Sequence, residues 1–531
     1  MSCLILILIT CSAIVMQAHA QMRLDPKKME PVLNGADKNQ IKERIKFLAD
    51  DKLKGRLPGT EGYQMAVDFV TSELKKLGVT PAGEVGYIQE VKLRKTNVDT
   101  TSVRLVVVQD GVETNLKYGR DFVVASDIRN RTAAGEGELV YAGYGIVAPH
   151  LMHNDYQSVT VKGKIVVVRD GTPEEFPASE RAHFNLALTK CEAAAKAGAA
   201  GIIILIGTSE VSRMKAMGKS MADGVTGFVL PDGSPFSTRL NLYPALSFLG
   251  YLKSSYYQSA IQGKENTTKI RFGFTSHWEE IQSENIIGVI PGTDPALSKE
   301  YVVHTAHIDH VGVGVPVKGD SIYNGAHDNA SGTACLLEIA KLYTRAKLRR
   351  SVLIVFVTSE EKGLLGSGYF ATHPTVPAEN IIADINTDMP TLIAPLLSIE
   401  PLGAKHSTLM KEVRNAAEYL KLDVMEDHMP EQVRFVRSDQ YSFIRRGIPA
   451  LHIKYGLKTN DPQLDLRKKI DEWTAAHYHQ PSDEYREDAF DFDAAVTYVK
   501  LNFLIGWQLA NETERPAWNK GDFFGQAFGK P

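Results

Sequence analysis

The chain has 531 residues, of which 44% are hydrophobic and 23% are charged, and its formal net charge is -3. Because this length exceeds one ordinary hydrophobic core, we expect two domains or one large domain with an insertion. The small net charge and the lack of a basic run argue against a protein that binds nucleic acid or an anionic membrane by charge.

The first 20 residues predict a cleaved signal peptide. An apolar stretch, "CLILILITCSAIVM", is followed by "AHA" before Gln21, which fits a small-x-small cleavage site. No lysine or arginine precedes the apolar stretch, which departs from the usual pattern. Cys11 leaves lipid attachment open as an alternative, although Thr10 stands where a smaller residue is usual. We therefore expect an exported protein, periplasmic or extracellular, with no membrane-spanning segment after cleavage.

Residues 21–134 are predicted to form the first part of the main domain. Residues 38–78 are typical of two helices around the turn-forming segment "GRLPGTEG", and "VRLVVVQDG" and "DFVVAS" are typical of strands.

Residues 135–278 are predicted to form an inserted, mostly β domain. The segments "GELVYAGYGIV" and "VKGKIVVVRDG" precede "ALTKCEAAAKAGAAGIIILIG", an alanine-rich helix that leads into an apolar strand. Such strands and a helix can bury their own core. Cys191 in this helix and Cys335 in a later one are expected to be buried core residues and not a disulfide pair.

Residues 279–531 are predicted to complete an α/β domain with a mixed, mainly parallel central sheet flanked by helices. Apolar strands alternate with helices here, and several strands lack polar positions, as in sheets that are covered on both faces. The strand candidates are "NIIGVIPG", "EYVVHTAH", "SVLIVFVTSE", "NIIADINTD" and "IPALHIKYG".

Residues with metal-ligand chemistry collect where these strands end, which is where the working site of an open α/β sheet lies. They are His307 with Asp309, Glu360 with Glu361, and Asp388, joined by Asp328, His479 and Asp483 from loops. Each of these motifs, taken alone, can be explained without a metal. They could be polar residues on the surface, a solvated "EE" pair on a helix, or a turn that caps a helix. Their convergence favours a metal site.

Two imidazoles with three carboxylates and no thiolate suit Zn²⁺ or a similar first-row ion. Five ligands are too many for one catalytic zinc, but they suit two ions that share a bridging carboxylate at about 3.5–4 Å, with a further carboxylate as general base. The sequence contains neither an HExxH helix nor a GxSxG elbow.

The ordered motifs resemble those of the co-catalytic di-zinc aminopeptidase family, which includes secreted bacterial aminopeptidases, glutamate carboxypeptidase and the non-enzymatic transferrin receptor. The segments are "GRLPGTEG", "AHIDHVG", "NGAHDNASG", "TSEEKGLLGS", "NTDM", "SDQYSFIRRGIP" and "YHQPSDE". The inserted block resembles the protease-associated (PA) domain that many members carry.

This resemblance implies a peptidase that binds two zinc ions, with cobalt or manganese as substitutes, and that acts on peptides with a free N-terminus. It implies one ion on His307 and Asp388, a second on Glu361 and His479, and Asp328 as the bridge. Asp309 would orient His307, and Glu360 would be the general base. Gln440 stands where members often have histidine, which leaves the pocket shape in doubt.

Three alternatives stay open on the same scaffold. Carboxypeptidase action would need cationic groups for a substrate carboxylate, and the candidates are Arg434, Arg437, Arg445 and Arg446. Glutaminyl cyclisation and an inactive binding module are the others.

Within the histidine cluster, His304 is expected to be a packing residue and His310 a neighbour of the ligands.

Overall fold

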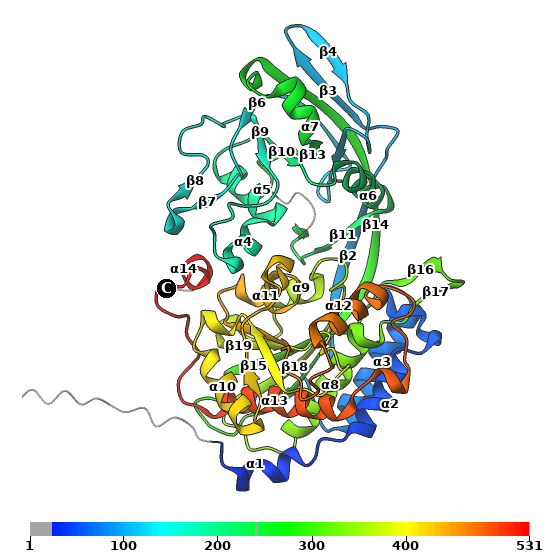
Figure 1. Ribbon diagram of the computed structural model, residues 1–531, viewed down its shortest axis with the longest axis vertical. Coiled ribbons are helices and arrows are strands. Elements are labelled where there is room, and N and C mark those ends of the chain that lie inside the picture. Colours follow the sequence, from blue (N-terminus) through cyan, green and yellow to red (C-terminus); the bar gives the residue numbers. More distant parts are fainter. Residues whose placement is uncertain (1–23, 239–242, 530–531) are drawn as a thin grey trace, which may run out of the picture.

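Two large hydrophobic cores organise the computed structural model, which describes residues 24–238 and 243–529. One core lies in the lower body of Figure 1 and the other fills the upper body. The predicted signal peptide, with Cys11, lies outside the described residues. Within the described ranges, no helix is long and apolar enough to span a bilayer. Cys191 and Cys335 are buried and free, as expected.

The lower body is built on a mixed, mainly parallel sheet, which confirms the predicted fold class. Its strands, in spatial order, are β14 (Thr268–Ile290), β18 (Ser351–Val357), β15 (Tyr301–His307), β19 (Ile381–Asn386), β22 (Ala450–Tyr455), β20 (Ser398–Leu402) and β21 (Asp423–Val424). The four strands from β18 to β22 run parallel, whereas β14 is antiparallel to β18, and β20, which pairs in parallel with β21, is antiparallel to β22. Every residue of β18 and β19 is buried, because helices cover both faces.

Helices pack on the two faces of this sheet. One face carries α2 (Lys38–Leu48), α3 (Glu61–Lys76), α8 (Gly332–Tyr343) and α13 (Phe492–Asn511), and the other carries α9 (Leu365–Thr372) and α11 (Gln440–Ile444). The two helices predicted within residues 38–78 are α2 and α3, capped by the side chains of Asp37 and Thr60. The helix α8 is buried at every position except Lys341, so it forms the centre of the larger core.

The upper body has its own sheet and core. Strands β6 (Thr132–Tyr141), β9 (Ile165–Arg169), β10 (Gly201–Ile206) and β13 (Phe248–Lys253) pair in parallel, and β5 (Phe122–Val124) joins β13 antiparallel. The helix α5 (Ala187–Lys196) packs beside them. The boundaries at 134/135 and 278/279 stay predictions, since β5 shares this core and β14 runs unbroken past residue 278.

The upper body is tied to the lower one by paired strands and by a helix. The long β14 pairs with β2 (Ile88–Val98) along residues 276–286, and this ribbon spans both bodies in Figure 1. At the other side, α4 (Ala178–Phe184) lies over the lower body, where the His183 ring nitrogen Nδ1 is 2.5 Å from the Tyr441 hydroxyl. The upper body therefore borders the edge of the sheet where the strands end.

Candidate metal centre

The strand register brings the predicted ligands to one edge of the sheet. Thr305 of β15 is paired with Asn386 of β19, so continuing each strand by two residues sets His307 beside Asp388. His307 is itself paired with Val357, the last residue of β18, and Glu360 and Glu361 follow that strand. Because the three strands are parallel, all of these side chains emerge at their carboxyl ends.

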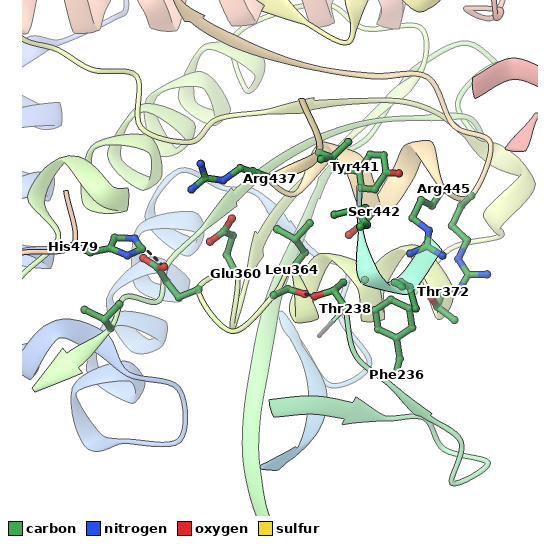
Figure 2. Close-up of a pocket in the computed structure, with 18 of the residues that line it drawn as sticks. Phe236, Thr238, Glu360, Leu364, Thr372, Arg437, Tyr441, Ser442, Arg445 and His479 are labelled. Carbon is green, nitrogen blue, oxygen red and sulfur yellow. Dashed lines mark hydrogen bonds and ion pairs between the residues drawn. The ribbon is translucent and has the colours of Figure 1, made fainter. Parts of the chain in front are cut away.

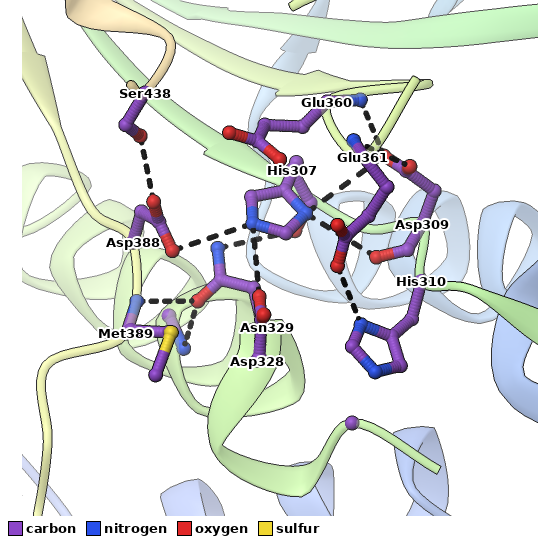
Figure 3. A network of polar contacts seen from close by, with 12 residues as sticks. His307, Asp309, His310, Asp328, Asn329, Glu360, Glu361, Asp388, Met389 and Ser438 are labelled. Atoms are coloured by element: carbon purple, nitrogen blue, oxygen red, sulfur yellow. Dashed lines mark hydrogen bonds and ion pairs between the residues drawn. The ribbon is translucent and has the colours of Figure 1, made fainter. Parts of the chain in front are cut away.

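The first cluster joins His307, Asp328 and Asp388. The His307 nitrogen Nε2 lies 3.4 Å from Asp328 Oδ1 and 3.3 Å from Asp388 Oδ1 (Figure 3). All three residues are buried. Asp328 comes from the loop that precedes α8, so the cluster draws on three separate segments of the chain.

The second cluster joins His479, Asp328 and Glu361. The His479 nitrogen Nε2 lies 3.1 Å from Asp328 Oδ2 and 3.0 Å from Glu361 Oε2. The two carboxylate oxygens of Asp328 therefore face two different histidines. This is the arrangement expected of a carboxylate shared between two cations.

The geometry of the donor atoms fits divalent ions. Zinc bonds of 2.0–2.2 Å in tetrahedral geometry hold neighbouring donors ~3.4 Å apart. The imidazole and carboxylate donors of both clusters are separated by 3.0 to 3.4 Å. One donor atom each from His307, Asp328 and Asp388 lies within 4.8 Å of the others. The residues present therefore fit the binding of divalent metal ions, and Asp328 belongs to both clusters.

The ligand carboxylates raise the pKa of both histidines. Although burial lowers the pKa of His307, hydrogen bonds to Asp328 and Asp388 outweigh it and raise that pKa well above its usual value. Burial likewise works against His479, but hydrogen bonds to Asp328 and Glu361 raise its pKa to about 10. The carboxylates thus favour positive charge at His307 and at His479. A metal ion that binds a ring nitrogen of either histidine displaces any proton on that nitrogen.

Glu360 stands apart from both clusters and faces a cavity (Figure 2). Burial raises the pKa of Glu360 well above its usual value; the charge of His307 opposes this, and those of Glu361 and Asp388 add to it. A carboxylate with a raised pKa beside the two clusters can accept and release a proton.

Asp309 lies beneath the clusters but makes its main contacts elsewhere. Its carboxylate is 3.8 Å from His307 Nδ1, whereas its backbone carbonyl oxygen is 3.2 Å from the same nitrogen. The carboxylate accepts hydrogen bonds from the backbone amides of Glu360, at 3.1 Å, and Glu361, at 3.4 Å. Asp309 thus fixes the turn that carries both glutamates as well as standing next to His307.

Two more residues position the ligands. The His310 nitrogen Nδ1 is 2.8 Å from Glu361 Oε1, on the opposite oxygen from His479. The buried carboxylate of Asp483 accepts the backbone amide of Asp328 at 3.1 Å and that of His327 at 2.9 Å. The sequence predicted His310 as a neighbour of the ligands, and it placed Asp483 near the site without a role.

The segment Ser438 to Gln440 supports Asp388. The Ser438 hydroxyl donates to Asp388 Oδ2 at 2.7 Å and accepts from the Asn386 side chain at 2.6 Å. Gln440 accepts from the same Asn386 amide at 3.0 Å and donates to the Phe435 carbonyl at 2.9 Å. The glutamine is therefore a buried link between β19 and the loop before α11. His304 hydrogen-bonds to Tyr343 in the core, as expected.

Sequence reasoning missed Arg56, in the "GRLPGTEG" segment. Its fully buried guanidinium donates to four backbone carbonyls, of Ile308, Leu48, Asn324 and Gly325, at 2.5 to 3.0 Å. Ile308 lies between His307 and Asp309, and Gly325 precedes Asp328 by three residues. Arg56 therefore holds together the two loops that carry these ligands. A lone arginine in a turn carries no sequence signal for such a contact.

We expect Arg56→Ala to lower the free energy of unfolding by about 3 kcal/mol or more, because it leaves buried carbonyls without donors. Arg56→Lys should lose less, since an ammonium can still reach some of them. Denaturant unfolding measures both. Arg104→Ala is the matched control, because Arg104 also donates to backbone carbonyls but is exposed. A change below about 1 kcal/mol for Arg56→Ala would contradict the role.

The cavity beside the clusters has a volume of about 520 Å³ and is lined by both bodies (Figure 2). Leu186 and Leu188 come from the upper body and Leu364, Tyr441 and Ser442 from the lower one, while Phe236 and Thr238 line it where the connecting segment contacts α9 and Gly363. Three of the four arginines named from the sequence, Arg437, Arg445 and Arg446, also line it. The fourth, Arg434, is instead paired with Glu400 and Asp427.

Comparisons with known proteins agree with this architecture. Residues 285–502 match the model of peptidase family M28, and residues 135–230 match that of the PA domain. Aminopeptidase Y of Saccharomyces cerevisiae is 30% identical over 236 residues, which cover 43% of this chain and 39% of that protein. The probable leucine aminopeptidase 2 of Aspergillus oryzae is 25% identical over 448 residues, which cover 81% and 75%.

The match to the yeast relative therefore spans less than half of that protein. Among solved structures, the aminopeptidase from Aneurinibacillus sp. strain AM-1 shares the fold, with a TM-score of 0.50 and 17% identity over 91% of this chain and 96% of that one. The family matches coincide with the sheet that carries both clusters and with the upper body that borders the cavity. Residues 285–502 thus match a peptidase family M28 domain, and residues 135–230, which precede them, match a PA domain.

Proposed function

We propose that the protein is a di-zinc aminopeptidase that hydrolyses the N-terminal peptide bond of its substrates. The observation that carries this proposal is the position of Asp328, whose two oxygens face one histidine each, beside a cavity that Glu360 also lines. The relatives named as aminopeptidases support the same reaction class.

The ligand assignment follows the two clusters. His307 and Asp388 would hold one ion, Glu361 and His479 the other, and Asp328 both. Zinc suits this mixture of imidazole and carboxylate donors, and cobalt or manganese can replace it. Two such ions polarise a peptide carbonyl and lower the pKa of water.

Glu360 would act as the general base. Its carboxylate faces the cavity, so it can accept a proton from the attacking water and pass it to the leaving amine (Figure 2). The backbone of Glu360 is fixed by Asp309, which keeps the carboxylate in place during both transfers.

An exopeptidase needs a site that admits a chain end and excludes a continuous chain. Here the PA domain contributes Leu186 and Leu188 to the cavity wall, to which Leu364, Gly368 and Tyr441 of the lower body also belong. This domain would therefore limit how much of the substrate can enter.

We further propose that the protein is exported, because an apolar stretch and then "AHA" precede Gln21.

The test is hydrolysis by the zinc-loaded protein of aminoacyl p-nitroanilides and of N-acetylated peptides, with metal content measured by mass spectrometry. We expect two zinc ions per chain and hydrolysis of the p-nitroanilides only. Cleavage of only the blocked peptides would overturn the aminopeptidase assignment. A protein that binds no zinc, cobalt or manganese would overturn the enzymatic one.

A carboxypeptidase is the second candidate, because Arg437, Arg445 and Arg446 line the cavity. Cleavage of the N-acetylated peptides from their C-terminal end would favour it. Glutaminyl cyclisation remains a further alternative on this scaffold, and the bridging position of Asp328 favours two ions over the single zinc of that reaction. An inactive binding module would be expected to lack ligands, whereas all five are present together here.

A further inference from the structure

Three arginines line the cavity beside the metal clusters. Glu360 and Glu361 lie at the metal clusters, whereas Arg437, Arg445 and Arg446 line the rest of the wall. We call these three residues the arginine wall. Figure 2 shows Arg445 on the far side of the cavity from His479 and Glu360, with Arg437 above Glu360. A substrate that extends away from the clusters would therefore pass along the arginine wall.

Few carboxylates lie close enough to the arginine wall to neutralise its positive charge. The closest carboxylate to Arg445 belongs to Glu192 of the PA domain, at 4.0 Å, which is the outer limit of an ion pair. Arg446 donates to the hydroxyl of Thr372. Among the residues that the structure describes, no carboxylate forms an ion pair with Arg437 or Arg446.

Arg434, three residues before Arg437, is by contrast held by ion pairs. It is paired with both Glu400 and Asp427 and is not among the residues that line the cavity. By contrast, Arg445 adds to the effect of burial in lowering the pKa of Arg446, so the two guanidiniums are close enough to repel one another. Their positive charge is left facing the cavity.

We propose that the arginine wall binds a carboxylate of the substrate, so that the enzyme selects peptides that carry a negative charge close to their N-terminus. This inference rests on the proposed aminopeptidase function. A planar guanidinium binds carboxylate through two parallel hydrogen bonds, and a peptide offers this group either as an aspartate or glutamate side chain or as its own C-terminus.

The size of the cavity favours a short substrate. Its volume of about 520 Å³ lies in the usual range of small-ligand pockets, ~300–1,000 Å³. Leu186 and Leu188 of the PA domain provide apolar cover over the same space. A dipeptide or an acidic first residue can place its scissile bond at the metal clusters and a carboxylate at the arginines, whereas a long neutral chain has no carboxylate to place there.

The experiment compares matched substrates on the zinc-loaded, full-length protein. One arm sets Leu-Ala against Leu-Ala amide, which differ in the C-terminal carboxylate. The other sets glutamyl p-nitroanilide against leucyl p-nitroanilide, which differ in the side chain. We expect kcat/KM to favour the charged member of at least one pair by about 10-fold to 100-fold, and the arm that responds identifies the source of the carboxylate.

The variants are Arg445→Gln with Arg446→Gln, and Arg437→Gln alone, which alters a single exposed side chain and keeps the test valid if the double variant does not fold. The preference for the charged substrate should fall to about twofold or less in at least one of them. Arg414→Gln is the control, an exposed arginine on α10 (Leu409–Leu420) outside this cavity, and should keep the full preference.

Each outcome separates this inference from the proposed function. Hydrolysis with no preference for either charged substrate would overturn the carboxylate site and leave the aminopeptidase assignment standing. A preference that persists in all of the arginine variants would also overturn it. A zinc-loaded protein that hydrolyses none of the four substrates would overturn the proposed function, and with it this inference.

Discussion

Glu360→Gln is expected to lower kcat roughly 1,000-fold, within the range that general acid–base catalysis contributes, while both zinc ions remain bound. The amide has the shape of the carboxylate but cannot accept a proton from water. Glu360 stands outside both ligand clusters, and its backbone is fixed by Asp309, so the substitution should leave the ligands in place. Steady-state hydrolysis of leucyl p-nitroanilide and zinc content by mass spectrometry measure the two effects.

The neighbouring Glu361→Gln is the matched control, with the same chemical change one residue along the chain. Because Glu361 contacts both His479 and His310, its loss should reduce the zinc content as well as the activity. A Glu360→Gln variant with nearly normal kcat would assign the base to another residue. One that loses zinc would instead make Glu360 a ligand.

The ligands could be found from the sequence because they follow apolar strands. Parallel strands end at one edge, so His307, Glu361 and Asp388 had to lie near each other once 301–307, 351–357 and 381–386 were recognised as strands. Strand ends do not predict that Asp328 lies beside His479, because both residues come from loops. That prediction came from the resemblance to the aminopeptidase family, in which the motifs follow one another in the same order.

The residues that position the ligands could not be found in this way. Strand alternation ceases to apply after His307, where β15 ends, so it could not predict that His310 contacts Glu361 or that the Asp309 carboxylate binds the amides of the glutamate turn. Arg56 lies more than 250 residues before the loops that it holds. Contacts of this kind depend on how turns pack, and turns have no periodic pattern to read.

The arrangement of the inserted domain shows a second limit. The apolar runs of residues 165–169 and 201–206 predicted buried strands, which the structure contains as β9 and β10. The sequence contained no sign that α4 would reach Tyr441, or that Phe236 would pack against α9. These contacts join surfaces from two bodies, each of which has its own core.

Asp328→Asn should weaken the binding of both ions, and this is the second large effect. Each oxygen of Asp328 lies 3.1 to 3.4 Å from the nitrogen of a different histidine, so the neutral amide removes charge from two sites at once. We expect zinc affinity to fall at least 10-fold to 100-fold at each site, and hydrolysis to fall to the background rate. Equilibrium dialysis gives the number of ions bound and their affinities.

Two further variants decide how a loss of zinc is to be interpreted. His479→Ala should remove one ion and spare the other, since His479 contacts only Asp328 and Glu361 among the ligands. Asp384→Asn is a matched buried control: Asp384 is a fully buried carboxylate on β19 that hydrogen-bonds to Thr305 and belongs to neither cluster. If Asp328→Asn loses a single ion and His479→Ala loses none, the carboxylate serves one site only. A single catalytic zinc would then replace the bridged pair, and the cyclase alternative would become the better account of this scaffold.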